Sequence, residues 1–306
     1  MSSLHRCLPW LILLLVLRDG GGGTAVAAAG KVPAIIVFGD SSVDTGNNNF
    51  IPTIARSNFW PYGLDFADGH PTGRFSNGRL ATDFISEAFG LPASIPAYLD
   101  TTLTIGEEII REALYIWSIG TNDFIENYYN LPERRMQYTA AEYEAYLLGL
   151  AESSIRAVHA LGGRKMDFTG LTPMGCLPAE RMGNRGDPGQ CNEEYNAVAR
   201  SFNAKLKQAV VPKLNKELPG LHLVYADTYD VLDAVVRKPA DYGFEHAERG
   251  CCGTGMFEAG YFCSLSTSLL CTNPNKYVFF DAIHPTERMY NMLADKVMNT
   301  TLHVFL

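Results

Sequence analysis

The sequence predicts an α/β fold in which helices flank a mainly parallel sheet. Short apolar runs rich in β-branched residues alternate along the chain with longer segments in which apolar residues recur every three or four positions. The 306 residues are 47% hydrophobic and 19% charged, which is the composition of a folded globular protein. No internal repeat or linker interrupts the alternation, so we expect one domain built from successive strand–helix units.

The candidate strands are short and almost continuously apolar, as strands covered on both faces are. They comprise residues 34–38, 113–119, 165–170 and 221–226. The candidate helices carry apolar residues at helical spacing and comprise residues 79–89, 140–161, 193–217 and 287–298. Pro212 is expected to break the third of these helices. Pro285 suits the start of the last one, where its missing N–H is not needed.

The first thirty residues have the features of a secretory signal peptide. Arg6 precedes the apolar run 8–17, and a Gly-rich stretch then leads to small residues that end at Ala29. The apolar run is too short for a membrane span, which needs about twenty residues. We therefore expect residues 1–29 to be a signal peptide and residues 30–306 to be a secreted, extracellular domain with no transmembrane segment after cleavage.

The charge balance argues against a nucleic-acid partner. Lys and Arg total 25 against 33 Asp and Glu, which gives a formal net charge of −8. Binding to a phosphate backbone depends on clustered positive charge. An acidic chain of this kind lacks the main driving force for such binding.

The cysteines fit an oxidising compartment. Cys7 lies in the predicted signal peptide, and its removal leaves an even number of cysteines, as disulfide-bonded secreted domains have. Cys176 and Cys191 enclose a polar loop, and we favour a disulfide between them; the other pairings stay open. Asn299 begins an Asn-x-Thr sequence and is a candidate N-glycosylation site.

Two polar clusters directly follow candidate strands. Ser41 comes after Gly39 and Asp40, which places it at the carboxyl edge of the sheet, where ligands bind in open α/β folds. Its backbone N–H is placed to stabilise a developing oxyanion. Asn122 follows the second strand and has a side-chain amide that can donate to the same oxyanion. Taken singly, each cluster is more often an ordinary turn or a helix cap.

A third cluster, Asp281 to His284, precedes the last helix. A carboxylate that holds one imidazole nitrogen leaves the other free to take a proton from a serine, which is the arrangement of a Ser-His-Asp triad. The alternatives are a helix-capping Asp beside a surface His, or two ligands of an incomplete metal site. Together with Ser41 and Asn122, this cluster supplies a nucleophile, an oxyanion donor, a base and a carboxylate that orients the base.

The residues around these clusters carry a resemblance to a known family. The matching stretches are VFGDSSVDTGNN at 37–48, PTGRFSNGR at 71–79, SIGTNDF at 118–124 and DAIHP at 281–285, with further similarity at 172–178 and 251–255. They resemble the plant GDSL esterase/lipases of the SGNH-hydrolase superfamily. The resemblance extends from about residue 33 to the end of the chain.

The resemblance implies a three-layer α/β/α sandwich and ester hydrolysis through an acyl-enzyme. Ser41 would be the nucleophile and first oxyanion donor, Asn122 another donor, His284 the base and Asp281 its orienting partner. No metal or organic cofactor is implied, because these groups suffice for acyl transfer. The implied substrate is an acyl ester, such as an acyl lipid, a cutin-like polymer or an acetylated glycan. The implied location is the plant apoplast or cell wall, and the oligomeric state is left open.

One block of the family is missing from the sequence. Family members carry a strand that ends in a Gly-rich stretch, and a glycine N–H of that stretch completes the oxyanion hole. Between Asp100 and Gly106 this chain passes directly into the next helix, and Gly106 is given no oxyanion role. We therefore expect a fold that lacks one βα segment and an esterase whose activity is impaired. The alternative is a truncated or spliced, non-catalytic secreted GDSL-like protein that binds a ligand without turnover.

Overall fold

The computed structural model describes residues 12–15, 32–102, 107–184, 186 and 189–306. Its main sheet has five strands in the order β1-β2-β3-β4-β5. Four of them are parallel neighbours and lie within one residue of the ranges expected from the sequence: β2 (Ile35–Gly39), β3 (Leu114–Ser118), β4 (Lys165–Thr169) and β5 (His222–Ala226). The predicted α/β fold with a parallel sheet is therefore confirmed.

The remaining strand, β1 (Ile12–Leu15), lies within the predicted signal peptide. It runs antiparallel to β2, with Ile12 opposite Gly39 and Leu15 opposite Ile36. The sequence features of this apolar run predict a leader segment and do not predict the pairing. An unpaired edge strand leaves a row of backbone N–H and C=O groups without partners. At the β2 edge, β1 pairs with these groups. The rest of the predicted signal peptide lies outside the described residues.

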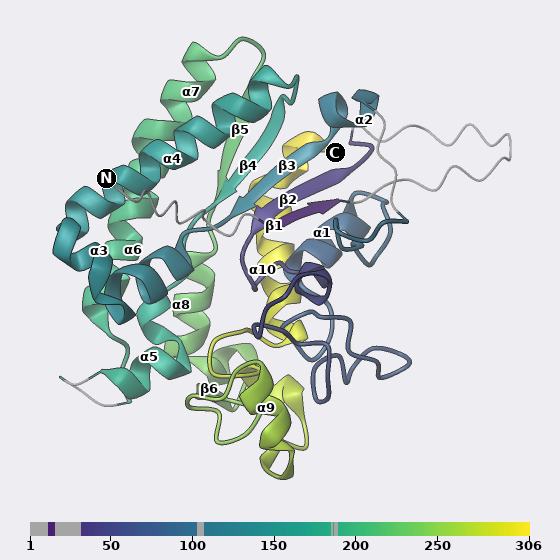
Figure 1. Ribbon diagram of the computed structural model, residues 1–306, viewed down its shortest axis with the longest axis vertical. Helices are drawn as coiled ribbons and strands as arrows, with labels where there is room; N and C mark the ends of the chain where they lie inside the picture. The colour runs from purple at the N-terminus through teal and green to yellow at the C-terminus, as the bar shows by residue number, and fades with distance from the viewer. Residues whose placement is uncertain (1–11, 16–31, 103–106, 185, 187–188) are drawn as a thin grey trace, which may run out of the picture.

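Helices cover both faces of the sheet, with α4, α6 and α7 on one side and α1 and α10 on the other (Figure 1). The first face packs Trp117 and Phe168 against Ile155 and Phe202. The helices are α1 (Ala81–Ala88), α2 (Glu107–Glu112), α3 (Pro132–Gln137), α4 (Ala140–Ala160), α5 (Pro178–Gly183), α6 (Glu193–Lys205), α7 (Val211–Glu217), α8 (Tyr229–Arg237), α9 (Tyr261–Leu265) and α10 (Glu287–Thr300). The short strands β6 (His246–Gly250) and β7 (Tyr277–Phe279) form a second, two-stranded sheet.

Pro212 does not break the helical segment as expected. Helix α6 continues through a π-helical stretch, Leu206–Val210, directly into α7. Pro212 stands in the first turn of α7, where the wider π turn before it has already changed the hydrogen-bonding pattern. Its missing N–H therefore costs less than it would in the middle of a regular helix.

The chain between α1 and β3 is short. Its described residues, 89–102 and 107–113, contain helix α2 and no multi-residue strand. The interval between Asp100 and Gly106, where we expected a βα segment to be missing, falls partly on residues 103–106, which lie outside the described residues. Within the described residues, the neighbours of β2 are β3 and β1.

A buried carboxyl group lies in the middle of the sheet. Asp167 of β4 is fully buried, and its Oδ2 accepts a hydrogen bond of 2.8 Å from the hydroxyl of Thr169. Its Oδ1 has no hydrogen-bond partner among the described residues. Burial raises the pKa of Asp167 to about 7, because the ionised carboxylate would lose its hydration there.

We predict that Asp167→Asn stabilises the fold more at pH 8 than at pH 5. The folded-state pKa lies above the unfolded value of 3.8, so the free energy of unfolding falls as the pH rises from about 4 to about 7. The asparagine does not titrate, and its advantage should be larger at pH 8 by about 2 to 3 kcal/mol. Urea unfolding at both pH values measures this difference, with the exposed Asp295→Asn as control. An equal effect of Asp167→Asn at both pH values would contradict the assignment.

A second prediction concerns the β2 edge. A chain that begins at residue 30 lacks β1, so backbone groups of β2 that pair with β1 become open to water. Hydrogen exchange in a peptide covering residues 35–39 should then be faster than in the full-length chain, whereas a peptide from β4 should be unchanged. Equal exchange of β2 in both chains would show that β1 does not protect this edge.

Candidate active site

Three side chains meet at the carboxyl edge of the sheet and form a hydrogen-bonded row. Strand β2 ends at Gly39, where a Cβ would collide with the side chain of Val43 and the backbone carbonyl of Ser118. The turn after it presents Ser41, whose Oγ lies 2.8 Å from Nε2 of His284. The other ring nitrogen of His284, Nδ1, lies 2.9 and 2.8 Å from the two carboxylate oxygens of Asp281.

The loop that carries Asp281 and His284 is fixed by local hydrogen bonds. Oδ1 of Asp281 accepts from the backbone N–H groups of Ile283 at 2.8 Å and His284 at 2.7 Å. The backbone N–H of Phe280 donates to the carbonyl of His284 at 2.7 Å. Asp281 is fully buried and His284 is almost so. The imidazole is therefore held in one orientation, with Nε2 directed at Ser41.

Tyr62 extends the hydrogen-bonded row of Ser41, His284 and Asp281. It is not among the site residues that the sequence predicts. Its hydroxyl donates to Oδ2 of Asp281 at 2.7 Å and accepts from the backbone N–H of Gly260 at 2.7 Å. Burial and the negative charge of Asp281 raise the pKa of Tyr62 well above its ordinary value, so the phenol remains a neutral donor. Tyr62 precedes Asp281 by 219 positions, and no local sequence pattern signals a contact over that distance.

The stretch 71–79 supports the His284 loop from the side. The ring of Phe75 packs on the imidazole of His284, with centroids 4.8 Å apart. The side chain of Asn77 accepts from the backbone N–H of Glu287 at 2.9 Å, at the start of α10. Arg74 makes a buried, bidentate ion pair with Asp83 of α1, and both N–O distances are 2.8 Å. The family-like motif at 71–79 thus supports His284 and the start of α10.

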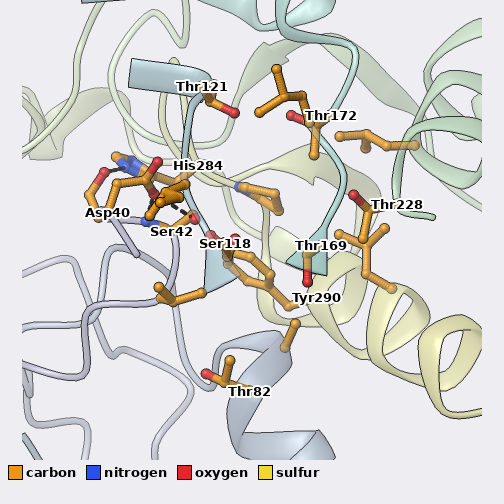
Figure 2. A pocket seen from close by; sticks show the side chains of 18 of the residues that line it. Asp40, Ser42, Thr82, Ser118, Thr121, Thr169, Thr172, Thr228, His284 and Tyr290 are labelled. Atoms are coloured by element: carbon orange, nitrogen blue, oxygen red, sulfur yellow. Dashed lines mark hydrogen bonds between the residues drawn. The ribbon is translucent and has the colours of Figure 1, made fainter. Parts of the chain in front are cut away.

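A cavity of about 110 Å³ opens beside Ser41 and runs between the sheet and helices α1, α8 and α10 (Figure 2). Its wall is mostly apolar and includes Ile85, Ile116, Leu232, Leu293, Ala294 and Val297. Figure 2 also shows the hydroxyl side chains of Thr82 and Tyr290 among its lining. Neither hydroxyl has a hydrogen-bond partner among the described residues. The mostly apolar wall of the cavity therefore also includes these two buried, unpaired hydroxyls.

Asn122 lines the same cavity as Ser41. It stands at the start of the π-helical segment Asp123–Asn130, directly after the turn that ends β3. The turn at Ser41 is braced by Asp40, whose Oδ1 accepts from the backbone N–H and the hydroxyl of Ser42 at 2.9 and 2.7 Å. Burial raises the pKa of Asp40. None of the described residues between α1 and β3 lines the cavity.

The structure also places the other residues singled out in the sequence. Cys176 and Cys191 are joined by a disulfide, and two further disulfides join Cys251 to Cys271 and Cys252 to Cys263, pairings that the sequence left open. Asn299 is exposed in the last turn of α10.

Among the helices of the described residues, none has both the length and the apolar character of a membrane span. The same part of the chain holds no group of three or more His, Cys, Asp or Glu residues placed to bind a metal ion.

Comparison with known proteins identifies the class to which this fold and site belong. Residues 35–297 match the model of the GDSL-like lipase/acylhydrolase family. Two Arabidopsis thaliana proteins, GDSL esterase/lipase At2g42990 and GDSL esterase/lipase At2g04570, are each 44% identical over 334 residues, which cover 92% of this chain and 95% of the relative. A third, GDSL esterase/lipase At4g26790, is 41% identical over 326 residues, with 90% and 93% covered.

The chain therefore belongs to the GDSL-like lipase/acylhydrolase family, a family of carboxylic ester hydrolases. This confirms the resemblance found in the sequence. The alignments of 334 positions are longer than the chain itself, which has 306 residues. These relatives consequently contain residues that have no counterpart here.

Proposed function

We propose that this chain is a secreted serine esterase that hydrolyses acyl esters through an acyl-enzyme. The observation that carries the proposal is the hydrogen-bonded row from Ser41 through His284 to Asp281 beside an apolar cavity. Nε2 of His284 takes the proton of Ser41 as Oγ attacks the ester carbonyl, and returns it to the departing alcohol. His284 then activates a water molecule, which releases the acid from Ser41. Asp281 holds Nδ1–H and stabilises the imidazolium formed in both steps.

The backbone N–H of Ser41 and the side-chain amide of Asn122 are the oxyanion donors in this proposal. Both residues line the cavity. The third donor of the family, a glycine N–H, belongs to the block that we propose is missing between Asp100 and Gly106. The length of the alignments and the absence of any cavity-lining residue from the described part of 89–113 support this view. Loss of one donor costs about 2.7 to 4 kcal/mol of transition-state stabilisation, so the activity should be impaired.

The cavity is the proposed site of the acyl group. Its apolar wall suits a hydrocarbon chain, and residues Leu293, Ala294 and Val297 of α10 form part of it. An acyl lipid or another acyl ester would place its carbonyl at Ser41 and its chain between the sheet and α10. The alcohol part would remain outside.

The proposed location is extracellular. Residues 1–29 have the features of a signal peptide, and the three disulfides suit an oxidising compartment. Asn299 is exposed and so is accessible for N-glycosylation. The similar proteins are from a plant, and the extracellular location proposed for a plant protein is the apoplast or cell wall.

A second candidate is a secreted GDSL-like protein that binds acyl ligands without turnover. It is favoured because no described residue of 89–113, the interval where the family's third oxyanion donor would be expected, lines the cavity. It differs from the first candidate in a measurable way, because binding without turnover does not depend on Ser41 as a nucleophile.

We predict that the chain of residues 30–306 hydrolyses a short p-nitrophenyl ester and that Ser41→Ala abolishes this activity. The expected loss is at least about a thousandfold, because alanine cannot form the acyl-enzyme. A chain with the family's Gly-rich block inserted between Asp100 and Gly106 should be faster by about a hundred- to a thousandfold. Thermal melting checks that all three proteins fold. Hydrolysis by Ser41→Ala at the parent rate would exclude the serine mechanism.

A further prediction concerns Tyr62, which acts on Asp281 and not on the substrate. Tyr62→Phe leaves Asp281 without one of its hydrogen-bond donors, so the carboxylate is held less firmly and orients the imidazole of His284 less well. The value of kcat should fall by about three- to tenfold while KM changes little, because the substrate does not contact Tyr62. Tyr98→Phe, a substitution of an exposed tyrosine, is the control. A lower melting temperature with an unchanged kcat would leave Tyr62 with a packing role only.

A further inference from the structure

One end of the molecule carries a segment held by two disulfides. Cys251 is joined to Cys271 and Cys252 to Cys263, and the chain between them includes α9. We call residues 251–275 the disulfide lobe; α9 lies at the lower end of Figure 1, next to β6. All residues of this lobe are described. The two cross-links limit the conformations that the lobe can adopt.

The disulfide lobe exposes large apolar side chains. Phe262 and Leu265 of α9 are each 63% exposed. The exposed set comprises Met256, Phe257, Tyr261, Phe262, Leu265 and Leu269. Single apolar residues on a surface are ordinary, whereas groups of them are typical of interaction sites, so this set is a candidate for one.

The same lobe presents no charge to solvent. Glu258 is the one charged residue of the sequence 251–275, and it is buried. Its carboxylate accepts from the backbone N–H groups of Thr254 and Gly255 at 3.0 and 3.1 Å, and from the hydroxyl of Thr254 at 2.8 Å. The chain as a whole carries a formal charge of −8, so this uncharged surface differs from the rest. Its chemistry fits an uncharged, apolar partner.

The apolar surface continues onto the loop that follows η1, a 3₁₀ turn (Asn47–Phe50). The ring of Phe59 packs edge-on against Tyr261, with centroids 6.0 Å apart. Next to it, Trp60 is half exposed, and Ile54 of the same loop is almost fully exposed. Side chains from two distant parts of the sequence therefore contribute to it.

The disulfide lobe is attached directly to the catalytic loop. The backbone N–H of Gly260 donates to Tyr62, which donates to Asp281. The backbone N–H of Ala282 donates to the carbonyl of Glu258 at 2.9 Å. A partner bound to the lobe would therefore lie at the end of the molecule that holds the triad. The family hydrolyses carboxylic esters. An uncharged, apolar partner that binds beside the triad of such an enzyme is therefore best matched by an aggregate of water-insoluble esters.

We propose that the disulfide lobe is a docking surface for the surface of uncharged ester lipids, such as a triacylglycerol droplet. Met256, Phe257, Phe262, Leu265 and Leu269 enter the apolar surface. The two disulfides limit the conformations of the lobe itself, and the hydrogen bonds of Gly260 and Glu258 attach it to the catalytic loop. Docking concentrates the protein on water-insoluble esters. Soluble esters reach Ser41 without it. The choice of an ester lipid as the partner rests on the proposed esterase function, whereas binding to it needs no nucleophile.

The test measures flotation of residues 30–306 with a triacylglycerol emulsion, in a Ser41→Ala background so that no ester is consumed. The double variant Phe262→Ser, Leu265→Ser should bind at least about tenfold more weakly, because two exposed apolar side chains no longer enter the droplet. Leu161→Ser, a change of an exposed leucine at the end of α4, is the matched control and should bind like the parent. With Ser41 present, the double variant should hydrolyse p-nitrophenyl acetate at the parent rate.

Three results would overturn the proposal: a parent chain that does not float with the emulsion, a double variant that floats equally well, or a parent that is a dimer at micromolar concentration while the double variant is a monomer. The last result would assign the surface to contact between two copies of the chain. Because flotation is measured without a nucleophile, its failure is distinct from a failure of the proposed esterase activity. Melting temperatures of the exposed-site variants check that they fold.

Discussion

The carboxylate of Asp281 is the group on which the rest of the site depends. It accepts from the ring of His284, from two backbone N–H groups of its own loop and from the hydroxyl of Tyr62. Each donor comes at a fixed distance and direction, so the carboxylate can hold the imidazole in one orientation. A buried charge of this kind is tolerated because it is fully hydrogen-bonded. The same bonds tie together the catalytic loop, the loop after the nucleophile and the disulfide lobe.

The sheet sets where these groups meet. The turns after β2 and β3 leave the same edge, which brings Ser41 and Asn122 to one cavity, and α10 begins just after His284. The motif at 71–79 then packs Phe75 on the imidazole and links α1 to α10 through Arg74 and Asn77. Hydrogen bonds from the 71–79 motif therefore join α1, through Asp83, to the start of α10, at Glu287. Apolar contact alone does not hold these parts of the site together.

Much of this arrangement could be predicted from the sequence, because its signals are local. The apolar runs located four strands to within one residue, and the spacing of Asp281 and His284 indicated a pair that can hydrogen-bond. Three features could not be predicted. The contact of Tyr62 with Asp281 spans 219 positions, the pairing of β1 depends on an edge left open by the rest of the sheet, and Pro212 is accommodated by a π-helical stretch that has no pattern of its own. The disulfide between Cys176 and Cys191 was expected from the short loop that they enclose.

The central claim is that His284 and Asp281 activate Ser41 as a nucleophile. Labelling the folded chain of residues 30–306 with a fluorophosphonate, followed by peptide mapping, tests this claim without any assumption about the natural ester. If His284 activates Ser41, a single covalent adduct forms on Ser41 and is lost in His284→Gln. A folded chain that forms no adduct, or that is labelled equally well in His284→Gln, would contradict it.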